Sequence, residues 1–268
     1  MSRTGLPMYD HPSVRGIVDD WWRGLARAFD AEGIAGLPAG LDRTTSRQAL
    51  WSAPDLLLSQ TCGYPLLYGF QDRLALVATP CYRADGTEGT DYGSHIVVAE
   101  GSPAAGIADL RGGIAAVNGA DSHSGMNAFR HLVAPHAEAG RFFASVVASG
   151  GHGESIAMIA RGEADVAAID CVTHALIATH APAELSGTRV LARTARVPGL
   201  PYVTRIDASD NLVARLRAGL ARAVADPELA TVREALLIQD FEVLGLADYE
   251  RIAEMEREAA ETGYPVLA

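Results

Sequence analysis

Short apolar runs alternate with amphipathic stretches along most of the chain. Residues 12–29 begin with Pro12, which suits the first turn of a helix, and continue with apolar side chains at helical spacing. The later runs are almost continuously apolar, as in strands that are covered on both faces. This alternation predicts an α/β fold, with a mostly helical segment from about residue 210 to 261. The predicted strands are 55–60, 74–80, 94–99, 113–119, 142–150, 164–170 and 188–194.

Two stretches of small residues and proline are typical of crossings between two lobes. Residues 99–106 read AEGSPAAG, and residues 196–204 read RVPGLPYVT. The segment between them has its own strands and helices. This pattern predicts a discontinuous first lobe, formed by residues 1–97 and 197–268, and an inserted second lobe, residues 98–196. Two such lobes enclose a cleft that closes by hinge motion.

Composition narrows the class of protein. The 268 residues are 49 % hydrophobic and 21 % charged, which is ordinary for a globular chain that can bury a sizeable core. The net charge of -11 argues against nucleic acid or an anionic membrane as a partner. The three cysteines form no CxxC pair and do not require an oxidising compartment.

The N-terminal residues lack the apolar core of a secretory signal, and no stretch approaches the ~18 apolar residues of a membrane span. As written, the chain is therefore expected in the cytoplasm without membrane insertion. A mature form whose signal has been removed would look the same and would be periplasmic.

Polar residues gather where the predicted strands end. In open α/β sheets, ligands bind beyond the carboxyl ends of the strands, so these residues indicate a ligand site. Tyrosines at strand ends line pockets in some proteins and pack in cores in others. The candidate ligand-binding residues are Tyr9, Tyr64, Tyr92, Ser122, His123, Ser124, His152 and Asp170.

Residues 122–125, SHSG, lie between a predicted strand and an apolar stripe at helical spacing. The free N–H groups and the dipole of a helix start favour an anion, and small hydroxyl groups add donors. Gly125 has no side chain, so the backbone of the turn can come close to an anion. The alternative is a plain N-cap, in which Ser122 or Asp121 satisfies the helix's own N–H groups. Spacing alone leaves both interpretations open.

Three further residues have two interpretations each. His152 lies in a glycine-rich turn and either donates to an anion or is solvated there. Asp170 either pairs with a ligand amine or caps a helix that begins at Cys171. Cys62 suits a small packed residue better than a nucleophile. The sequence contains no GxSxG, HExxH or GxGxxG motif after a strand, and no P-loop lysine, so it predicts no catalytic residue, metal or cofactor.

Several segments, taken together and in their order along the chain, resemble the phosphate/phosphonate-binding proteins of ABC importers. The likeness covers roughly residues 5–205 and implies the type II periplasmic binding-protein fold. The segments that carry it are PDLLLSQTCGYPL, ADLRGGIAAVNGADSHSGMNAF, GEADVAAIDCVTHAL and VPGLPYV.

The resemblance also implies roles for individual residues. Ser122, His123 and Ser124 match the Ser/Thr-rich helix start that holds the phosphonate oxygens, although His123 replaces a small hydroxyl residue of that turn. Tyr92 matches a tyrosine that contacts the ligand, and His152 matches a turn histidine. Asp170 matches an acidic residue that meets a ligand amine. Tyr9 and Tyr64 do not come from the resemblance. They are candidate ligand-binding residues because they lie at the ends of predicted strands.

These observations predict a solute-binding protein for a small oxyanion, most simply a phosphonate or phosphate. It would deliver its ligand to an ABC transporter permease or act as a cytosolic sensor. The alternative is an enzyme on the same fold, of the kind that makes a thiamine pyrimidine precursor or acts as a small-acid lyase. In that case His152, Asp170 and Cys62 are the candidates for acid, base or nucleophile.

Overall fold

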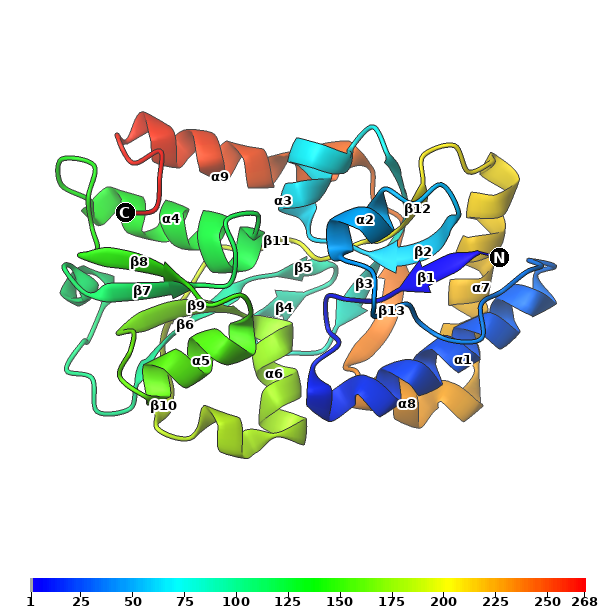
Figure 1. The fold of residues 1–268 in the computed structure, drawn as a ribbon, viewed down its shortest axis with the longest axis horizontal. Helices are drawn as coiled ribbons and strands as arrows, with labels where there is room; N and C mark the ends of the chain where they lie inside the picture. The colour runs from blue at the N-terminus through cyan, green and yellow to red at the C-terminus, as the bar shows by residue number, and fades with distance from the viewer. Residues whose placement is uncertain (1) are drawn as a thin grey trace. The chain divides into compact units, whose positions relative to one another are not determined.

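A computed structural model describes residues 2–268 and divides them into two α/β units (Figure 1). Unit 1 contains the residues up to Arg83, residues 88–90 and residues 198–248; unit 2 contains residues 84–87, 91–197 and 249–268. The mixed α/β class is the one that the sequence predicts. The boundaries differ from the expected ones, because residues 84–87, 91–97 and 249–268 belong to unit 2. A cleft between the units stays a prediction.

Unit 1 is built on a five-stranded sheet of order β1-β2-β12-β3-β13. Strands β1 and β2 are parallel, whereas β12 is antiparallel to β2 and β3, and β13 is antiparallel to β3. Helices α1 and α7 pack together, and α2 packs on β1 and β2. The strands are β1 (Arg3–Gly5), β2 (Leu56–Gln60), β3 (Leu74–Tyr82), β12 (Tyr202–Arg205) and β13 (Ile238–Glu242). The helices are α1 (Arg15–Ala31), α2 (Arg47–Trp51), α3 (Gly63–Pro65), α7 (Asp210–Ala225) and α8 (Ala230–Ala235).

The first helix shows how the apolar stripe of the sequence becomes packing. The predicted helix is confirmed as a 3-10 turn at Pro12–Val14 that continues into α1. Trp21 is buried, and its Nε1 donates a hydrogen bond to the Tyr202 hydroxyl at 3.1 Å. Full burial of such a large apolar side chain stabilises the fold by roughly 2–3 kcal/mol. The stripe thus fixes α1 against the sheet of unit 1.

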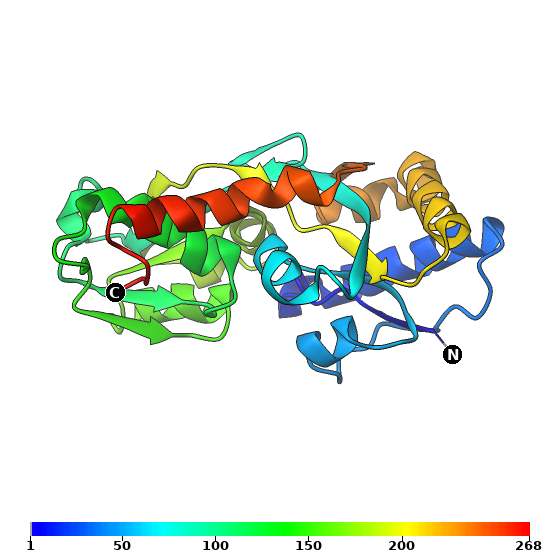
Figure 2. The same ribbon diagram turned by 90° about the horizontal axis from the view of Figure 1, so that it is seen from above.

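Unit 2 has a second five-stranded sheet, of order β10-β6-β9-β7-β8. Strands β7, β8 and β9 are parallel, and β6 is antiparallel to both β9 and β10. Helices α4 and α9 cover one face, and α5 and α6 cover the other (Figures 1 and 2). The strands are β6 (Ser94–Ala99), β7 (Ile114–Val117), β8 (Ser145–Ala148), β9 (Val166–Asp170) and β10 (Thr188–Arg193). The helices are α4 (Ala128–Val133), α5 (His152–Ala160), α6 (Cys171–His180) and α9 (Glu250–Glu261).

Short elements complete the chain. The two-residue strands β4 (Thr87–Glu88), β5 (Asp91–Tyr92) and β11 (Val197–Pro198) form a third sheet of order β11-β5-β4. A π-helical turn, η4 (His123–Asn127), leads directly into α4. No helix within residues 2–268 is both long and apolar enough to cross a membrane.

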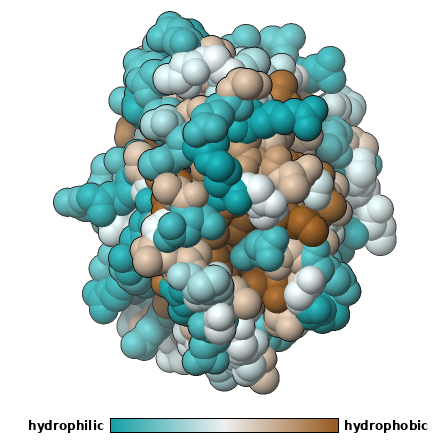
Figure 3. Space-filling model, turned by 90° about the vertical axis from the view of Figure 1, so that its left-hand side faces the viewer, coloured by the Kyte–Doolittle hydropathy of each residue, from teal (hydrophilic) through white to brown (hydrophobic). Residues whose placement is uncertain are grey.

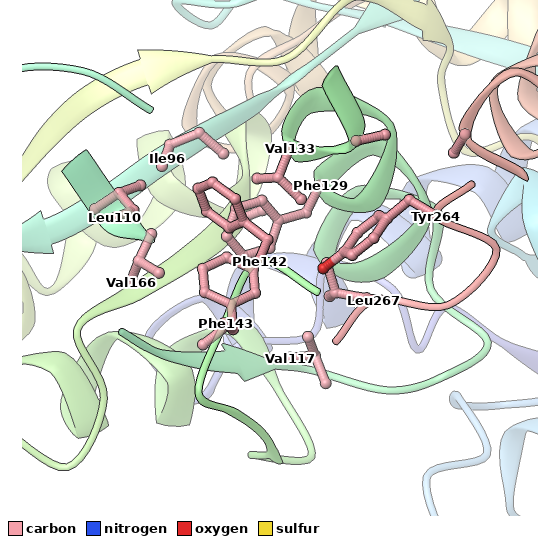
Figure 4. Close-up of a cluster of buried hydrophobic side chains, with 14 of the residues drawn as sticks. Ile96, Leu110, Val117, Phe129, Val133, Phe142, Phe143, Val166, Tyr264 and Leu267 are labelled. Atoms are coloured by element: carbon pink, nitrogen blue, oxygen red, sulfur yellow. The ribbon is translucent and has the colours of Figure 1, made fainter. Parts of the chain in front are cut away.

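Both faces of the unit 2 sheet are buried, which explains its almost continuously apolar strands. Ile96 packs with Phe129 and Tyr264 on the α4 and α9 face (Figure 4). Its neighbour Val97 packs with Ile156 on the other face. Successive strand residues point to opposite faces, so each strand needs apolar residues at every position. Figure 3, which views the left-hand side of Figure 1, shows hydrophobic residues between polar ones over unit 2.

Candidate ligand-binding site

The topology of unit 2 brings several polar segments to one edge of its sheet. Because β7, β8 and β9 are parallel, the residues that follow them lie at the same edge. These are residues 118–125 and residues 149–152, and Asp170, the last residue of β9, lies at the same edge. Strand β6 runs the other way, so its first residue, Ser94, lies at this edge and pairs in register with Asp170. The rule about strand ends therefore predicts this clustering.

The turn at residues 122–125 begins a continuous helical segment. Ser122 is the N-cap, with extended backbone, and its Oγ accepts a hydrogen bond from the Gly125 N–H at 3.0 Å. The capping interpretation is thus confirmed for Ser122. A helix start has several N–H groups without partners inside the helix, and this cap satisfies one of them. The turn therefore caps itself and still suits an anion.

His152 joins the turn through hydrogen bonds. Its Nε2 lies 3.0 Å from Ser124 Oγ and 3.2 Å from Asn118 Nδ2. Ser122 Oγ is in turn 3.4 Å from Ser124 Oγ. His152 is the first residue of α5, and its side chain is half-buried and hydrogen-bonded to the turn. The structure brings three predicted residues together and adds Asn118, which the sequence marks only as part of an Asn-Gly turn.

Gly125 is required by packing within the site. A Cβ at this position would lie 2.0 Å from Asn118 Oδ1 and 3.2 Å from His152 Cε1. The first distance is far shorter than a van der Waals contact, so any side chain at residue 125 would displace Asn118. The glycine therefore allows the turn, the amide of Asn118 and the His152 ring to meet.

Both histidines of the site are neutral at pH 7. Burial lowers the pKa of His152 to about 4, against a smaller opposing effect of the Ala168 backbone carbonyl. Burial, with a smaller contribution from His131, lowers the pKa of His123 to about 3. The hydroxyl, amide and imidazole groups at the turn are therefore uncharged, and they would bind an anion through their dipoles.

We expect acid to destabilise the protein through these two histidines. Between pH 6.5 and about 4 the unfolded chain binds a proton at His152 that the native state excludes. The free energy of unfolding should fall as pH falls through this window, by at most about 3.4 kcal/mol for this residue. Urea unfolding at several pH values measures the loss. His152→Gln should reduce it, and an unchanged pH slope in that variant would contradict the assignment.

Asp170 caps the next helix. Its Oδ1 accepts hydrogen bonds from the N–H groups of Val172 and Thr173, at 2.8 and 2.9 Å. The capping interpretation is confirmed, and the role of Asp170 toward a ligand amine stays a prediction.

Ser94 and Tyr92 lie next to the turn. Ser94 Oγ donates to the Ser124 backbone carbonyl at 3.0 Å, which ties β6 to the turn. Tyr92 is buried, and its ring centroid is 6.2 Å from that of His123. Tyr92 thus belongs to the same group of side chains in unit 2.

The other two predicted tyrosines lie in unit 1. Tyr9 is buried and packs edge-on against Tyr82, with ring centroids 5.1 Å apart. Gln60 Nε2 donates to the Tyr82 hydroxyl at 3.1 Å, so Tyr82 is a neighbour that the sequence did not indicate. Tyr64 packs against Tyr68 at 4.7 Å. A shared site for Tyr9, Tyr64 and the residues of unit 2 stays a prediction.

The cysteines are packed in the interior. Cys62, Cys81 and Cys171 are buried and form no disulfide with one another, so Cys62 is a packed residue. Within the described part of the chain, no three His, Cys, Asp or Glu side chains form a group that could hold a metal ion.

Comparison with known proteins gives a family and a fold. The sequence matches a family model described as the periplasmic substrate-binding protein of the phosphonate ABC transporter, over residues 55–249. A search of curated proteins gives no match. The structure resembles a binding-protein component of an ABC phosphonate transporter from Pseudomonas aeruginosa, with 15% identity, 98% of this chain and 87% of that chain covered, and a TM-score of 0.78.

Two further structures cover almost the whole chain. PhnD1 from Prochlorococcus marinus, in complex with methylphosphonate, has 13% identity, covers 97% of this chain and 98% of that chain, and gives a TM-score of 0.77. A protein from Xanthomonas citri bound to ATP has 18% identity, covers 98% of both chains, and gives a TM-score of 0.70. At these identities the likeness shows the fold alone.

Proposed function

Because the chain belongs to the family of periplasmic substrate-binding proteins of phosphonate ABC transporters, we propose that unit 2 binds a small oxyanion at residues 122–125. The family and the type II periplasmic binding-protein fold are those that the sequence predicts. Members of this family are periplasmic. We infer that this chain passes its ligand to a transporter permease.

The group of neutral polar side chains at the start of η4 is the observation that supports this proposal. The Ser122 and Ser124 hydroxyls lie beside the N–H groups of the turn, and His152 Nε2, which faces the Asn118 Nδ2 donor, lies 3.0 Å from Ser124 Oγ. Tetrahedral oxyanions offer several acceptor oxygens in a small volume, so converging short donors suit them. The chain's net negative charge does not prevent this, because the helix start is locally positive.

A phosphonate is the ligand class that we favour over inorganic phosphate. The similar structure from Prochlorococcus marinus holds methylphosphonate. Asp170, which pairs with Ser94 across the sheet, offers a carboxylate close to the turn. A carboxylate there would favour an organic phosphonate with an amine and would repel an additional anionic group.

A ligand screen tests the proposed function. Methylphosphonate, 2-aminoethylphosphonate, phosphate, phosphite, sulfate and adipate are compared by thermal shift and then by calorimetric titration. A ligand at 100 times its dissociation constant stabilises the native state by ~2.7 kcal/mol, which raises the melting temperature by roughly 5–10 °C. We expect at least one phosphonate to do so. No shift with any oxyanion, or turnover of the ligand seen by mass spectrometry, would contradict the proposal.

A further inference from the structure

Unit 2 contains a small pocket where β6 begins and β10 ends. Its volume is about 280 Å³, a little less than the pockets of drug-sized ligands, so it suits a small molecule. Its lining residues all belong to unit 2 and come from positions 86, 93–95 and 193–196.

The histidine of this pocket faces away from the turn at residues 122–125. Ser94 Oγ donates to the Ser124 carbonyl, so the Ser94 side chain faces that turn. Successive strand residues point to opposite faces, so the next side chain, His95, lies on the other face of β6. There it packs edge-on against His174 of α6, with ring centroids 4.9 Å apart. His95 therefore does not belong to the site that we assign to the oxyanion.

His95 is a buried polar side chain that lacks hydrogen bonds. It is 3 % exposed, and neither of its ring nitrogens has a hydrogen-bond partner among residues 2–268. Burial lowers the pKa of His95, against a smaller opposing effect of Asp85, so the ring is neutral at pH 7 and carries one N–H. A buried N–H without a partner is unfavourable, so an acceptor in the pocket would stabilise this ring.

The carboxylate of Asp85 marks the position of such an acceptor. Asp85 Oδ2 pairs with Arg193 NH2 and lies 3.8 Å from His95 Nε2, which is too far for a hydrogen bond. A carboxylate oxygen thus lies between the guanidinium group and the imidazole. Because a carboxylate only accepts, it favours the imidazole proton on Nε2. Asp85 is 70 % exposed, and an exposed ion pair contributes little to stability, so another anion can replace it.

Arg193 has donors for a further acceptor. It pairs in register with His95 across the antiparallel strands β10 and β6, so the two side chains lie on the same face of the sheet. Its guanidinium group has five N–H groups, and within the described chain Asp85 is the acceptor that it contacts. This planar fork matches the two oxygens of a carboxylate. Arg196 lines the same pocket and adds positive charge.

We propose that this pocket is a second ligand site, which binds a small carboxylate between Arg193 and His95 in place of the Asp85 side chain. One carboxylate oxygen accepts from the guanidinium group, and the other accepts from His95 Nε2–H. Asp85 is then an internal competitor that the ligand displaces into solvent. The inference goes beyond the proposed function and does not depend on it, because no side chain of residues 122–125 takes part.

The imidazole of His95 reports the ligand directly. Long-range ¹H–¹⁵N correlation spectra of the wild-type protein are recorded at about pH 7.5, where carboxylates are ionised, while malonate is added at constant ionic strength. We expect the His95 Nε2 signal to shift and to saturate, because its N–H gains a hydrogen bond. Malonamide is the matched neutral probe, and we expect no saturable shift with it.

Two variants test the residues that hold the carboxylate. Arg193→Gln removes the charged fork, so we expect the saturable shift to be lost. Asp85→Asn removes the competing carboxylate at similar shape, so we expect malonate to bind about two- to fivefold more tightly. Glu138→Gln is the control, because Glu138 pairs with an exposed arginine of unit 2, Arg111, at 3.2 Å and lies outside the pocket. We expect wild-type affinity in this variant.

The proposal would be overturned if malonate did not shift the His95 signal, or if malonamide or Arg193→Gln gave the same saturable shift. Saturation in Asp85→Asn but not in the wild type would also overturn it, since the pocket would then hold only the chain's own carboxylate. A gain of affinity in Glu138→Gln equal to that in Asp85→Asn would reveal an effect of net charge alone and contradict the site. None of these results depends on whether an oxyanion binds at residues 122–125.

Discussion

Ser124→Asp is expected to lose ligand affinity by a factor of one hundred or more and to remain folded. The new carboxylate would occupy the donors that hold the oxyanion in wild type. Two like charges about 4 Å apart repel by about 4 kcal/mol at the effective dielectric of a protein surface, which corresponds to about a thousandfold in affinity. The same helix start stabilises an acidic side chain, so the melting temperature without ligand should stay within a few degrees of wild type.

Ser124→Asn is the matched control for this charge effect. Asparagine is similar in shape to aspartate and is neutral, so we expect a loss of about tenfold or less, as for one altered hydrogen bond. Calorimetric titration of both variants with the best ligand of the screen gives the comparison. Affinity of the wild-type order in Ser124→Asp would exclude residues 122–125 as the anion site.

Gly125→Ala should weaken both folding and binding. Its Cβ would lie 2.0 Å from Asn118 Oδ1, so Asn118 must move away from His152. Overpacking of this kind costs about 1–3 kcal/mol of the free energy of unfolding. Displacing the Asn118 amide also disturbs the donor group, so we expect affinity to fall about tenfold or more. Urea unfolding measures the first effect, and calorimetric titration measures the second.

Gly151→Ala is the control for a glycine of the same site. Gly151 directly precedes His152, its backbone is extended with φ -173°, and a Cβ there would meet nothing within 4 Å. We expect a change of less than about 0.5 kcal/mol in stability and little change in affinity. Equal effects of the two substitutions would show that the packing of Asn118 on Gly125 does not hold the site together.

The sequence predicts the strands that are almost continuously apolar and the polar residues that follow them. Each of those strands appears in the structure within a few residues of its expected position. The meeting of Ser122, Ser124 and His152 follows from one topological rule, that parallel strands end at the same edge. The local sequence is sufficient to predict these site residues, because each polar loop begins where a buried, apolar strand ends.

The sequence did not predict the strands that depend on distant partners. β12 has four residues in a segment rich in proline and glycine, and it forms by pairing with β2 and β3. β13, with the sequence IQDFE, lies at the sheet edge inside a region that appears helical, so its polar residues remain exposed. Pairing across more than a hundred residues leaves no periodic signal in either segment.

The site residues that the sequence missed also act through distant contacts. Asn127 and Arg130 appear as ordinary polar positions of a helix, yet both are buried because α9 and the C-terminal residues pack over them. The composition gives no indication that residues 249–268 belong to unit 2. Only the tertiary structure shows that the chain's last helix supports the turn.

The central claim is that the turn at residues 122–125 holds the oxygens of a small oxyanion. A crystal structure of the complex with the tightest phosphonate of the screen tests it most directly. We expect phosphonate oxygens at about 2.7–3.1 Å from Ser124 Oγ and from an N–H of the turn. A phosphonate bound elsewhere, with no oxygen in contact with residues 122–125, would contradict the claim.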